Sequence, residues 1–202
     1  LVDLRSTEER QLSPTKIAGV PYHAIGYPMS AITSAMTPAA GEVPKNGGAL
    51  YRHMPKMLAP QIRMLFGQLL AKRGPVAYNC SAGQDRTGFA TAVVLSALGV
   101  PRATIVEDYH LSTRYRRPEF ESAAFDPAHF PDNAYAQMRV RYQGADKAPR
   151  RPEPLKEADG TAFLSFALDE IDKTYGSVEG YLDKEIGVSA QDIAALRATY
   201  LE

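Results

Sequence analysis

Residues 76–90 read VAYNCSAGQDRTGFA and include the only cysteine of the chain, Cys80. The apolar run at 76–79 predicts a short strand, and a loop of five residues, 81–85, follows the cysteine. An apolar helix is predicted from Arg86 onward. A strand that passes through a short loop into a helix is typical of α/β domains, and it places Cys80 at the carboxyl end of a strand.

The loop after Cys80 has the composition of an anion site. Ala82 and Gly83 are small enough to let backbone approach a ligand, and successive N–H groups of the loop can surround an anion at the start of the helix. The same donors stabilise a thiolate. Arg86 offers a planar fork for two oxygens of a phosphoryl group, and Thr87 can donate its hydroxyl to the thiolate. Together these residues predict a nucleophile inside an anion site, which cysteine-based hydrolysis of phosphate esters requires.

The alternative is that Cys80 only packs in the core. A lone cysteine is most often a small buried hydrophobic residue, and an arginine six positions after a cysteine is a weak pattern by itself. The full order of strand, cysteine, glycine-containing loop, Asp-Arg-Thr-Gly and helix is much less accidental. This order favours a nucleophilic role for Cys80.

Length and composition set outer limits on function. The 202 residues suffice for one domain with a sizeable core, and 23 basic and 23 acidic residues give a net charge of zero, which argues against a dedicated nucleic-acid binder. A single cysteine excludes an intrachain disulfide framework and a cysteine-rich zinc site, and the four histidines have no metal-like spacing. No run reaches the roughly 18 apolar residues of a membrane span.

We expect a protein that is cytoplasmic, or secreted without a visible signal. The opening LVDLR starts directly on a strand-like segment, so we also expect further residues upstream.

The rest of the chain continues the α/β order. Short runs of β-branched and aromatic residues predict strands at 1–4, 20–27 and 76–79. Residues 28–48 are rich in proline, glycine and small side chains, which predicts a loop. Helices are predicted where apolar residues recur at helical spacing or a proline opens a first turn, at 50–72, 86–98, 101–111, 163–171 and 193–201.

Residues 113–160 contain six prolines and scattered charges, so a separate core is not expected there. We predict a lid-like insertion of helical and irregular structure that covers the site; the alternative is a surface excursion far from it. The aromatic residues expected to dock it on the body are Phe120, Phe125, Phe130 and Tyr135. The basic cluster Arg114, Arg116 and Arg117 either forms a solvated face or meets incoming phosphate.

The segment NCSAGQDRTGF resembles the Cys-x5-Arg signature of protein tyrosine phosphatases. It is most similar to a bacterial atypical branch with a His-Cys-x-Ala-Gly-Lys-Asp-Arg-Thr-Gly pattern, which includes dual protein and phosphoinositide phosphatases of the mycobacterial tyrosine phosphatase B kind. VDLRSTEER, VEDYHLST and TYGSVEGYL resemble other segments of that branch, so the resemblance covers most of the chain. It implies a single tyrosine-phosphatase-like α/β domain, a central sheet flanked by helices, and a cysteine-dependent enzyme without metal or cofactor.

The resemblance also implies a role for each loop residue. Cys80 attacks phosphorus and forms a thiophosphate intermediate, Arg86 binds the phosphate, and Asp85 is the general acid. The substrate-binding positions are Ser81, Ala82, Gly83, Gln84 and Thr87. A second acid considered in this family falls on Met29, which cannot transfer a proton, and this favours Asp85. The alternative for Asp85 is a structural carboxylate. Asp3 is expected to be a structural partner at a strand end.

Two positions depart from the pattern of the branch. Asn79 replaces a histidine that helps to set the loop, and Gln84 replaces a lysine. We expect Gln84 at the rim of the pocket, where the loss of a cation weakens the case for phosphoinositides. Three possibilities stay open: a protein tyrosine phosphatase, a phosphatase for phosphoinositides or small molecules, and a pseudophosphatase that binds phosphorylated partners without turnover.

Overall fold

The computed structural model describes residues 1–36, 48–121, 124–143 and 153–201, and it confirms the α/β class. Three short strands, β1 (Val2–Asp3), β2 (His23–Ala24) and β3 (Tyr78–Asn79), form a parallel sheet in the order β2-β1-β3. Each strand lies within a predicted range but is shorter than predicted. In the second range the flanking residues Val20 and Ile25 are exposed, so only the two central residues join the ladder.

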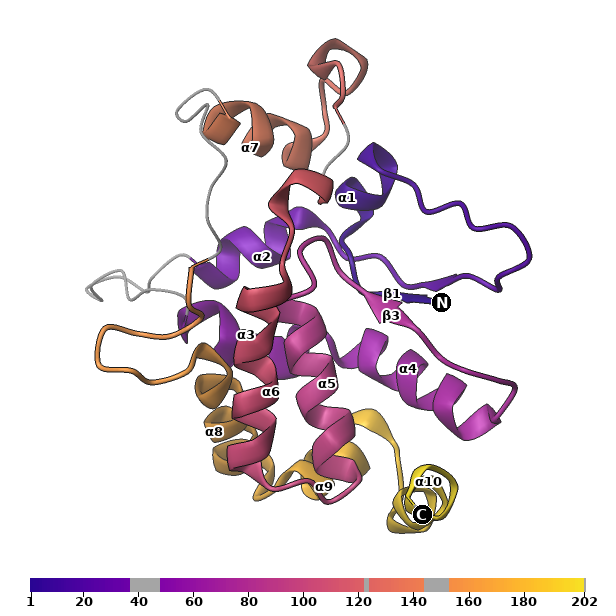
Figure 1. Cartoon of the computed structure of the whole chain (residues 1–202). Helices are drawn as coiled ribbons and strands as arrows, with labels where there is room; N and C mark the ends of the chain where they lie inside the picture. The colour runs from indigo at the N-terminus through magenta and orange to yellow at the C-terminus, as the bar shows by residue number, and fades with distance from the viewer. Residues whose placement is uncertain (37–47, 122–123, 144–152, 202) are drawn as a thin grey trace.

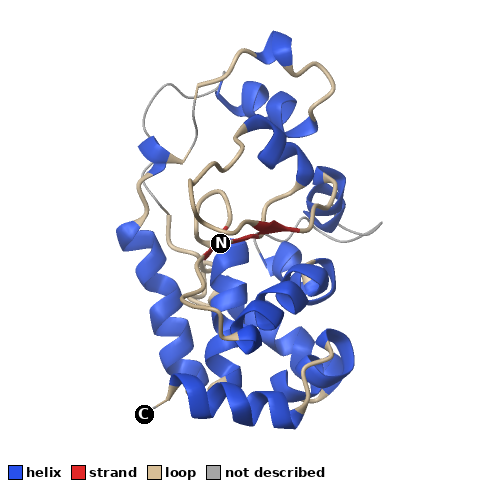
Figure 2. Cartoon of the chain, turned by 90° about the vertical axis from the view of Figure 1, so that its right-hand side faces the viewer, coloured by secondary structure: helices blue, strands red, loops and turns tan. Residues whose placement is uncertain are grey.

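Helices surround this small sheet. Figure 1 shows α1 (Thr7–Leu12) and α7 (Ala134–Gln143) above the strands and α4 (Ala59–Ala71) and α5 (Asp85–Ala97) below them. In the rotated view of Figure 2, helices again lie on both sides of the strands. The remaining helices are α2 (Met29–Met36), α3 (Gly48–Met57), α6 (Arg102–Tyr115), α8 (Phe163–Tyr175), α9 (Val178–Tyr181) and α10 (Ala190–Tyr200), with short helical turns at Pro118–Phe120, Pro127–His129 and Leu182–Ile186. Within the described ranges, no helix combines the length and the apolarity needed to cross a membrane.

The single helix predicted at 50–72 is wrong, because two helices occupy this stretch. α3 ends at Met57, and α4 begins at Ala59 with Pro60 in its first turn. Proline fits there because the first N–H groups of a helix have no partner inside the helix. In one continuous helix, the ring of Pro60 would instead clash with the carbonyl four residues earlier.

The loop predicted at 28–48 is also wrong for its first part, which forms α2. The backbone N–H of Met29 donates to both carboxylate oxygens of Glu8 at 2.9 Å, so a residue distant in the chain caps this helix. A negative charge at a helix N-terminus is stabilising. Residues 37–47 of the predicted loop lie outside the described residues.

One hydrophobic core joins the sheet to the lower helices. β1 packs against α4, and β3 packs against α5, whose residues Phe89 and Val93 are fully buried. α5 therefore starts at the carboxyl edge of the sheet, directly after the loop that carries Cys80. Asp3, at the end of β1, is held by Arg5 and by the hydroxyl of Tyr22 at 2.7 Å, as predicted for a structural partner.

In the described part of the proline-rich segment, the helix α7 contacts α1 and α2. Asn133 precedes α7 and is buried. Its amide nitrogen donates to the Glu8 carbonyl at 3.0 Å and to the side chain of Gln11 at 3.3 Å. Phe125 packs edge-on against Phe130 at a ring separation of 6.3 Å. The side chain of Phe120 and residues 122–123 and 144–152 lie outside the described residues.

Candidate active site

The predicted loop connects β3 to α5, and Cys80 begins it. Cys80 is 6% exposed; it belongs to the hydrophobic core and also lines a pocket. The hydroxyl of Thr87 donates to Cys80 Sγ at 3.1 Å, as the sequence predicts. Gly83 has a φ of 71°, in the left-handed region. Glycine adopts this backbone conformation without the steric strain that a side chain would cause. The side-chain amide of Asn79 donates to the Cys80 carbonyl at 3.1 Å, so this replacement of histidine still contributes a hydrogen bond to the loop.

Arg86 is held from one side by a carboxylate that the sequence analysis did not identify. Nη1 and Nη2 of Arg86 donate to the two oxygens of Glu9 at 2.6 and 2.7 Å. A second Nη1–H donates to the hydroxyl of Tyr27 at 2.8 Å. A guanidinium has five N–H donors, so Nε–H and one Nη2–H are left without an acceptor among the described residues. These two neighbouring donors form one edge of the guanidinium, which matches two oxygens of a phosphoryl group.

Glu9 is buried and accepts several hydrogen bonds. Besides those from Arg86, it accepts from the hydroxyl of Ser81 and, at 2.7 Å, from the backbone N–H of Ser6. The Ser6 bond belongs to a capping box that starts α1. Burial raises the pKa of Glu9, but the hydrogen bond and charge of Arg86 outweigh burial and lower it from 4.5 to about 2. Burial alone would lower the pKa of Arg86, but the hydrogen bond and the charge of Glu9 hold that pKa well above its usual range. Both groups are therefore charged at neutral pH.

Tyr27 completes the support of Arg86. Burial raises the pKa of Tyr27 to about 12, although the neighbouring Arg86 acts in the opposite direction. The protonated hydroxyl accepts from Arg86 and donates to the Leu4 carbonyl at 3.1 Å, so it links the guanidinium to the end of β1.

Asp85 is the first residue of α5, and its side chain reaches the pocket. The buried hydroxyl of Tyr51, from α3, donates to Asp85 Oδ1 at 2.8 Å, and the hydroxyl of Tyr109, from α6, lies 2.5 Å from that of Tyr51. The sequence analysis gave no role to either tyrosine.

The expectation that Gln84 lies at the pocket rim is wrong. Its side chain is 1% exposed and does not line the pocket. It accepts a hydrogen bond from Arg116 at 2.6 Å, while its amide nitrogen lies 3.4 Å from the hydroxyl of Thr113. Arg116 also forms a two-pronged pair with Glu121. The side chain of Gln84 thus turns away from the ligand site toward α6, because it is the buried residue that precedes the first turn of α5.

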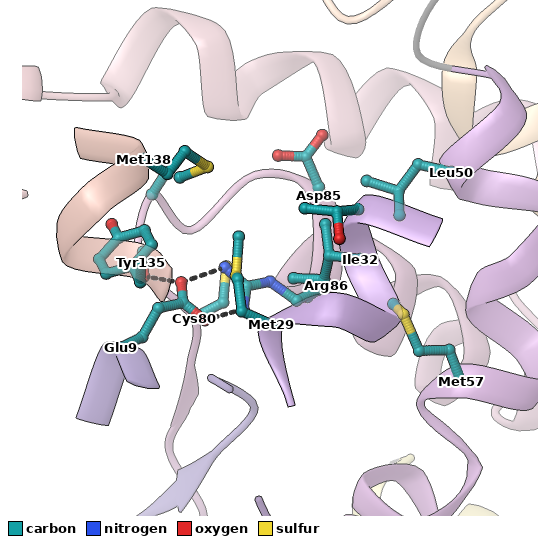
Figure 3. Close-up of a pocket in the computed structure, with 13 residues that line it drawn as sticks. Glu9, Met29, Ile32, Leu50, Met57, Cys80, Asp85, Arg86, Tyr135 and Met138 are labelled. Atoms are coloured by element: carbon teal, nitrogen blue, oxygen red, sulfur yellow. Dashed lines mark hydrogen bonds and ion pairs between the residues drawn. The ribbon is translucent and has the colours of Figure 1, made fainter. Parts of the chain in front are cut away.

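The pocket has a volume of about 240 Å³, with polar groups at its base and apolar walls. Figure 3 shows Glu9, Cys80 and Arg86 together on one side of the pocket and Asp85 across from Glu9. Ser81 and Ala82 also line it, whereas Gly83, Gln84 and Thr87 do not. The apolar wall comes from three helices, α2, α3 and α7, and consists of Met29, Ile32, Leu50, Met57, Tyr135 and Met138. Tyr135 and Met138 belong to α7, so the proline-rich segment reaches the pocket.

The sequence of the chain is similar to those of known phosphatases. The profile of the tyrosine phosphatase family matches residues 1–202. The chain is 28% identical over 210 residues to a tyrosine-protein phosphatase of Nostoc commune, in an alignment that covers 97% of this chain and 64% of that protein. It is 34% identical over 139 residues to the triple specificity protein phosphatase PtpB of Mycobacterium tuberculosis, with 66% and 46% covered. The chain thus spans less than two thirds of the length of either relative.

Proposed function

Because this chain belongs to the tyrosine phosphatase family, a family of cysteine-dependent hydrolases, we propose that it hydrolyses phosphoric monoesters and that phosphotyrosine in proteins is its main substrate. The observation that carries the proposal is the free edge of Arg86. Glu9 and Tyr27 occupy the other donors, and Arg86 lines the same pocket as Cys80 and Asp85.

The proposed reaction has two steps. The Cys80 thiolate attacks phosphorus in line, a P–S bond forms, and the P–O bond to the leaving group breaks. Asp85 gives its proton to the departing oxygen. Arg86 and the N–H groups of the loop 81–85 hold the equatorial oxygens while charge redistributes. In the second step Asp85 takes a proton from water, whose oxygen attacks phosphorus and releases inorganic phosphate and the thiolate.

The walls of the pocket favour an aromatic ester. A phosphate at the base places the adjoining substrate group against side chains such as Met29, Leu50 and Met138, which offer apolar contacts to a phenyl ring. Among the pocket-lining residues of the described chain, Arg86 is the only cation. Within the described part of the chain, a multiply phosphorylated headgroup therefore meets no second cationic partner at the wall, which disfavours phosphoinositides even though one relative carries the name triple specificity phosphatase.

We also propose that residues 113–160 act as a lid. Tyr135 and Met138 contribute to the pocket wall, and Asn133 anchors the same helix on α1. A cover of this kind excludes water from the thiolate and must move for large substrates.

The test is steady-state turnover on a phosphotyrosine peptide, a phosphoserine peptide and a phosphoinositide. We expect the highest kcat/KM on the phosphotyrosine peptide, no turnover by Cys80→Ser, and a loss of roughly 10²–10³-fold for Arg86→Ala, as for other preorganised donors. Preference for the phosphoinositide would favour the lipid alternative. Binding of phosphopeptide without turnover by the unaltered chain would mean a pseudophosphatase.

The role of Asp85 has its own test. Asp85→Asn is expected to slow phenyl phosphate, whose leaving group needs a proton, far more than 4-nitrophenyl phosphate, whose leaving group is a much weaker base. An equal loss on both substrates would point to a structural carboxylate.

A further inference from the structure

Two buried tyrosines lie behind Asp85, on the side away from the substrate. Tyr51 is 1% exposed and Tyr109 is 3% exposed, and their rings meet edge to face with centroids 6.2 Å apart. Phe163 packs against Tyr51 at 5.9 Å. Side chains from α3, α6 and α8 thus fix the hydroxyl of Tyr51 at the start of α5, where it meets the carboxylate of Asp85.

The two hydroxyl protons can be assigned by counting. A phenol has one proton, and Tyr51 gives its proton to Asp85 Oδ1 at 2.8 Å. The 2.5 Å contact between the hydroxyls then requires Tyr109 to be the donor and Tyr51 the acceptor. Burial, followed by the charge of Asp85, holds the pKa of Tyr51 well above its ordinary value of 10, so the hydroxyl keeps its proton throughout the range of ordinary assays. The result is a directed chain of hydrogen bonds from Tyr109 through Tyr51 to Asp85.

Gly88, the last residue of the Asp-Arg-Thr-Gly run, makes room for this chain. A Cβ atom at Gly88 would lie 2.7 Å from Cδ2 and 2.9 Å from Cε2 of Tyr109, closer than real contacts allow. Any side chain on this face of α5 would therefore displace the ring that supports Tyr51. The run thus combines a residue at the reaction centre, Asp85, with a residue that admits the support of Asp85.

We propose that Tyr51 is a positioning residue for the general acid: by holding Oδ1 of Asp85, it leaves Oδ2 to carry the proton that goes to the leaving group. This inference rests on the proposed function, in which Asp85 is the acid. Carboxylate oxygens exchange places by rotation about the last side-chain bond, which is a soft torsion. The Tyr51 hydrogen bond restricts that rotation, so Asp85 needs less reordering when the leaving oxygen departs.

The test compares Tyr51→Phe with Tyr181→Phe. Tyr181 is a fully buried tyrosine that donates to the Pro55 carbonyl at 2.7 Å and does not line the pocket, so its variant removes a similar hydrogen bond. We expect Tyr51→Phe to lower kcat on phenyl phosphate roughly tenfold, which is part of the 10²–10⁴-fold that a general acid supplies. The loss on 4-nitrophenyl phosphate should be less than about twofold, and KM should not change for either substrate. Tyr181→Phe should leave both kcat values unchanged.

Further variants keep the inference separate from the proposed function. Tyr51→Phe should add nothing to the loss on phenyl phosphate that Asp85→Asn already causes, since both act on one proton transfer. If Tyr51→Phe folds poorly, Tyr109→Phe is the milder variant, with the same pattern at roughly two- to threefold. If Asp85→Asn slows both substrates equally, the assigned acid is wrong and the inference fails with it. If Asp85→Asn separates the substrates but Tyr51→Phe and Tyr109→Phe do not, only the positioning role is overturned.

Discussion

Replacing Glu9 with glutamine is the sharpest test of how the site is held together. The substitution keeps the shape of the side chain and removes its charge. In the folded protein, the Glu9 carboxylate accepts from Arg86 at 2.6 and 2.7 Å and from the Ser6 backbone at 2.7 Å, and almost none of it is exposed. Glutamine offers a single oxygen to these donors and places an NH₂ group against one of them. Arg86, whose side chain is only 12% exposed, loses its counter-charge.

The size of the effect follows from the pKa of Glu9. A fall from 4.5 to about 2 corresponds to a preference of roughly 3 kcal/mol for the ionised carboxylate in the folded state. Breaking a buried ion pair from one side typically costs about 3–5 kcal/mol. We therefore expect Glu9→Gln to lower the free energy of unfolding by about 3 kcal/mol. With a urea dependence of roughly 2 kcal/mol/M, the midpoint falls by about 1.5 M.

The assay is urea unfolding at pH 7, where Glu9 is ionised in both the folded and the unfolded state. Glu179→Gln is the matched control. Glu179 pairs with Arg197 at 3.6 Å, but the two side chains are 54% and 41% exposed, so the change should cost less than about 1 kcal/mol. Equal midpoints for the two variants would refute the reasoning. As a second readout, inorganic phosphate should bind Glu9→Gln less tightly than the unaltered protein, because the free edge of Arg86 is no longer fixed.

Three further outcomes follow from the same contacts. Because the folded pKa of Glu9 is depressed, its stabilisation is complete above pH 4.5 and is lost as the pH falls toward 2. Urea unfolding between pH 5 and pH 3 should thus show a steeper loss of stability for the unaltered protein than for Glu9→Gln. Gln84→Lys should lower stability by about 1–3 kcal/mol, since it puts a second cation beside Arg116 at a buried position; an unchanged melting temperature would contradict that placement. Asn133→Ala should speed inactivation of Cys80 by peroxide if α7 shields the thiolate, whereas an unchanged rate would argue against a lid.

The elements that the sequence predicted well are those whose signals are local. The strand before Cys80 and the helix after it are bounded by glycine and proline and carry continuous apolar runs, and both occur where predicted. α2 was missed because its cap is Glu8, which lies 21 residues earlier than Met29 in the chain. The break before α4 was in principle readable, since Pro60 falls four residues after Lys56 inside an otherwise helical pattern.

The residues of the site also divide into those that local sequence signals predict and those that depend on contacts distant in the chain. Cys80 and Arg86 lie in one short loop and helix start, so their spacing alone predicted that they act together. Glu9 lies 77 positions from Arg86, and Tyr51 lies 34 positions from Asp85. Ser6 and Glu9 do show the Ser-x-x-Glu spacing of a capping box, which explains both residues locally and conceals the second role of the carboxylate. Nothing in a helix-forming stretch distinguishes a tyrosine that packs from one that supports an acid.

The charge balance of the site limits the way in which it can bind phosphate. Arg86 carries one positive charge and Glu9 one negative charge, so the pair is neutral; in the proposed reaction Asp85 starts protonated and the Cys80 thiolate adds only negative charge. Net attraction therefore cannot be what holds a phosphate monoester, which is itself anionic at neutral pH. The binding energy must come from directed donors: the free edge of Arg86, the N–H groups of the loop and the N-terminus of α5. Under the proposed function, such donors fit one phosphoryl group at the base of the pocket and gain nothing from a second one further out. Under the proposed function, we therefore expect the unaltered protein to prefer substrates with a single phosphate on an apolar group.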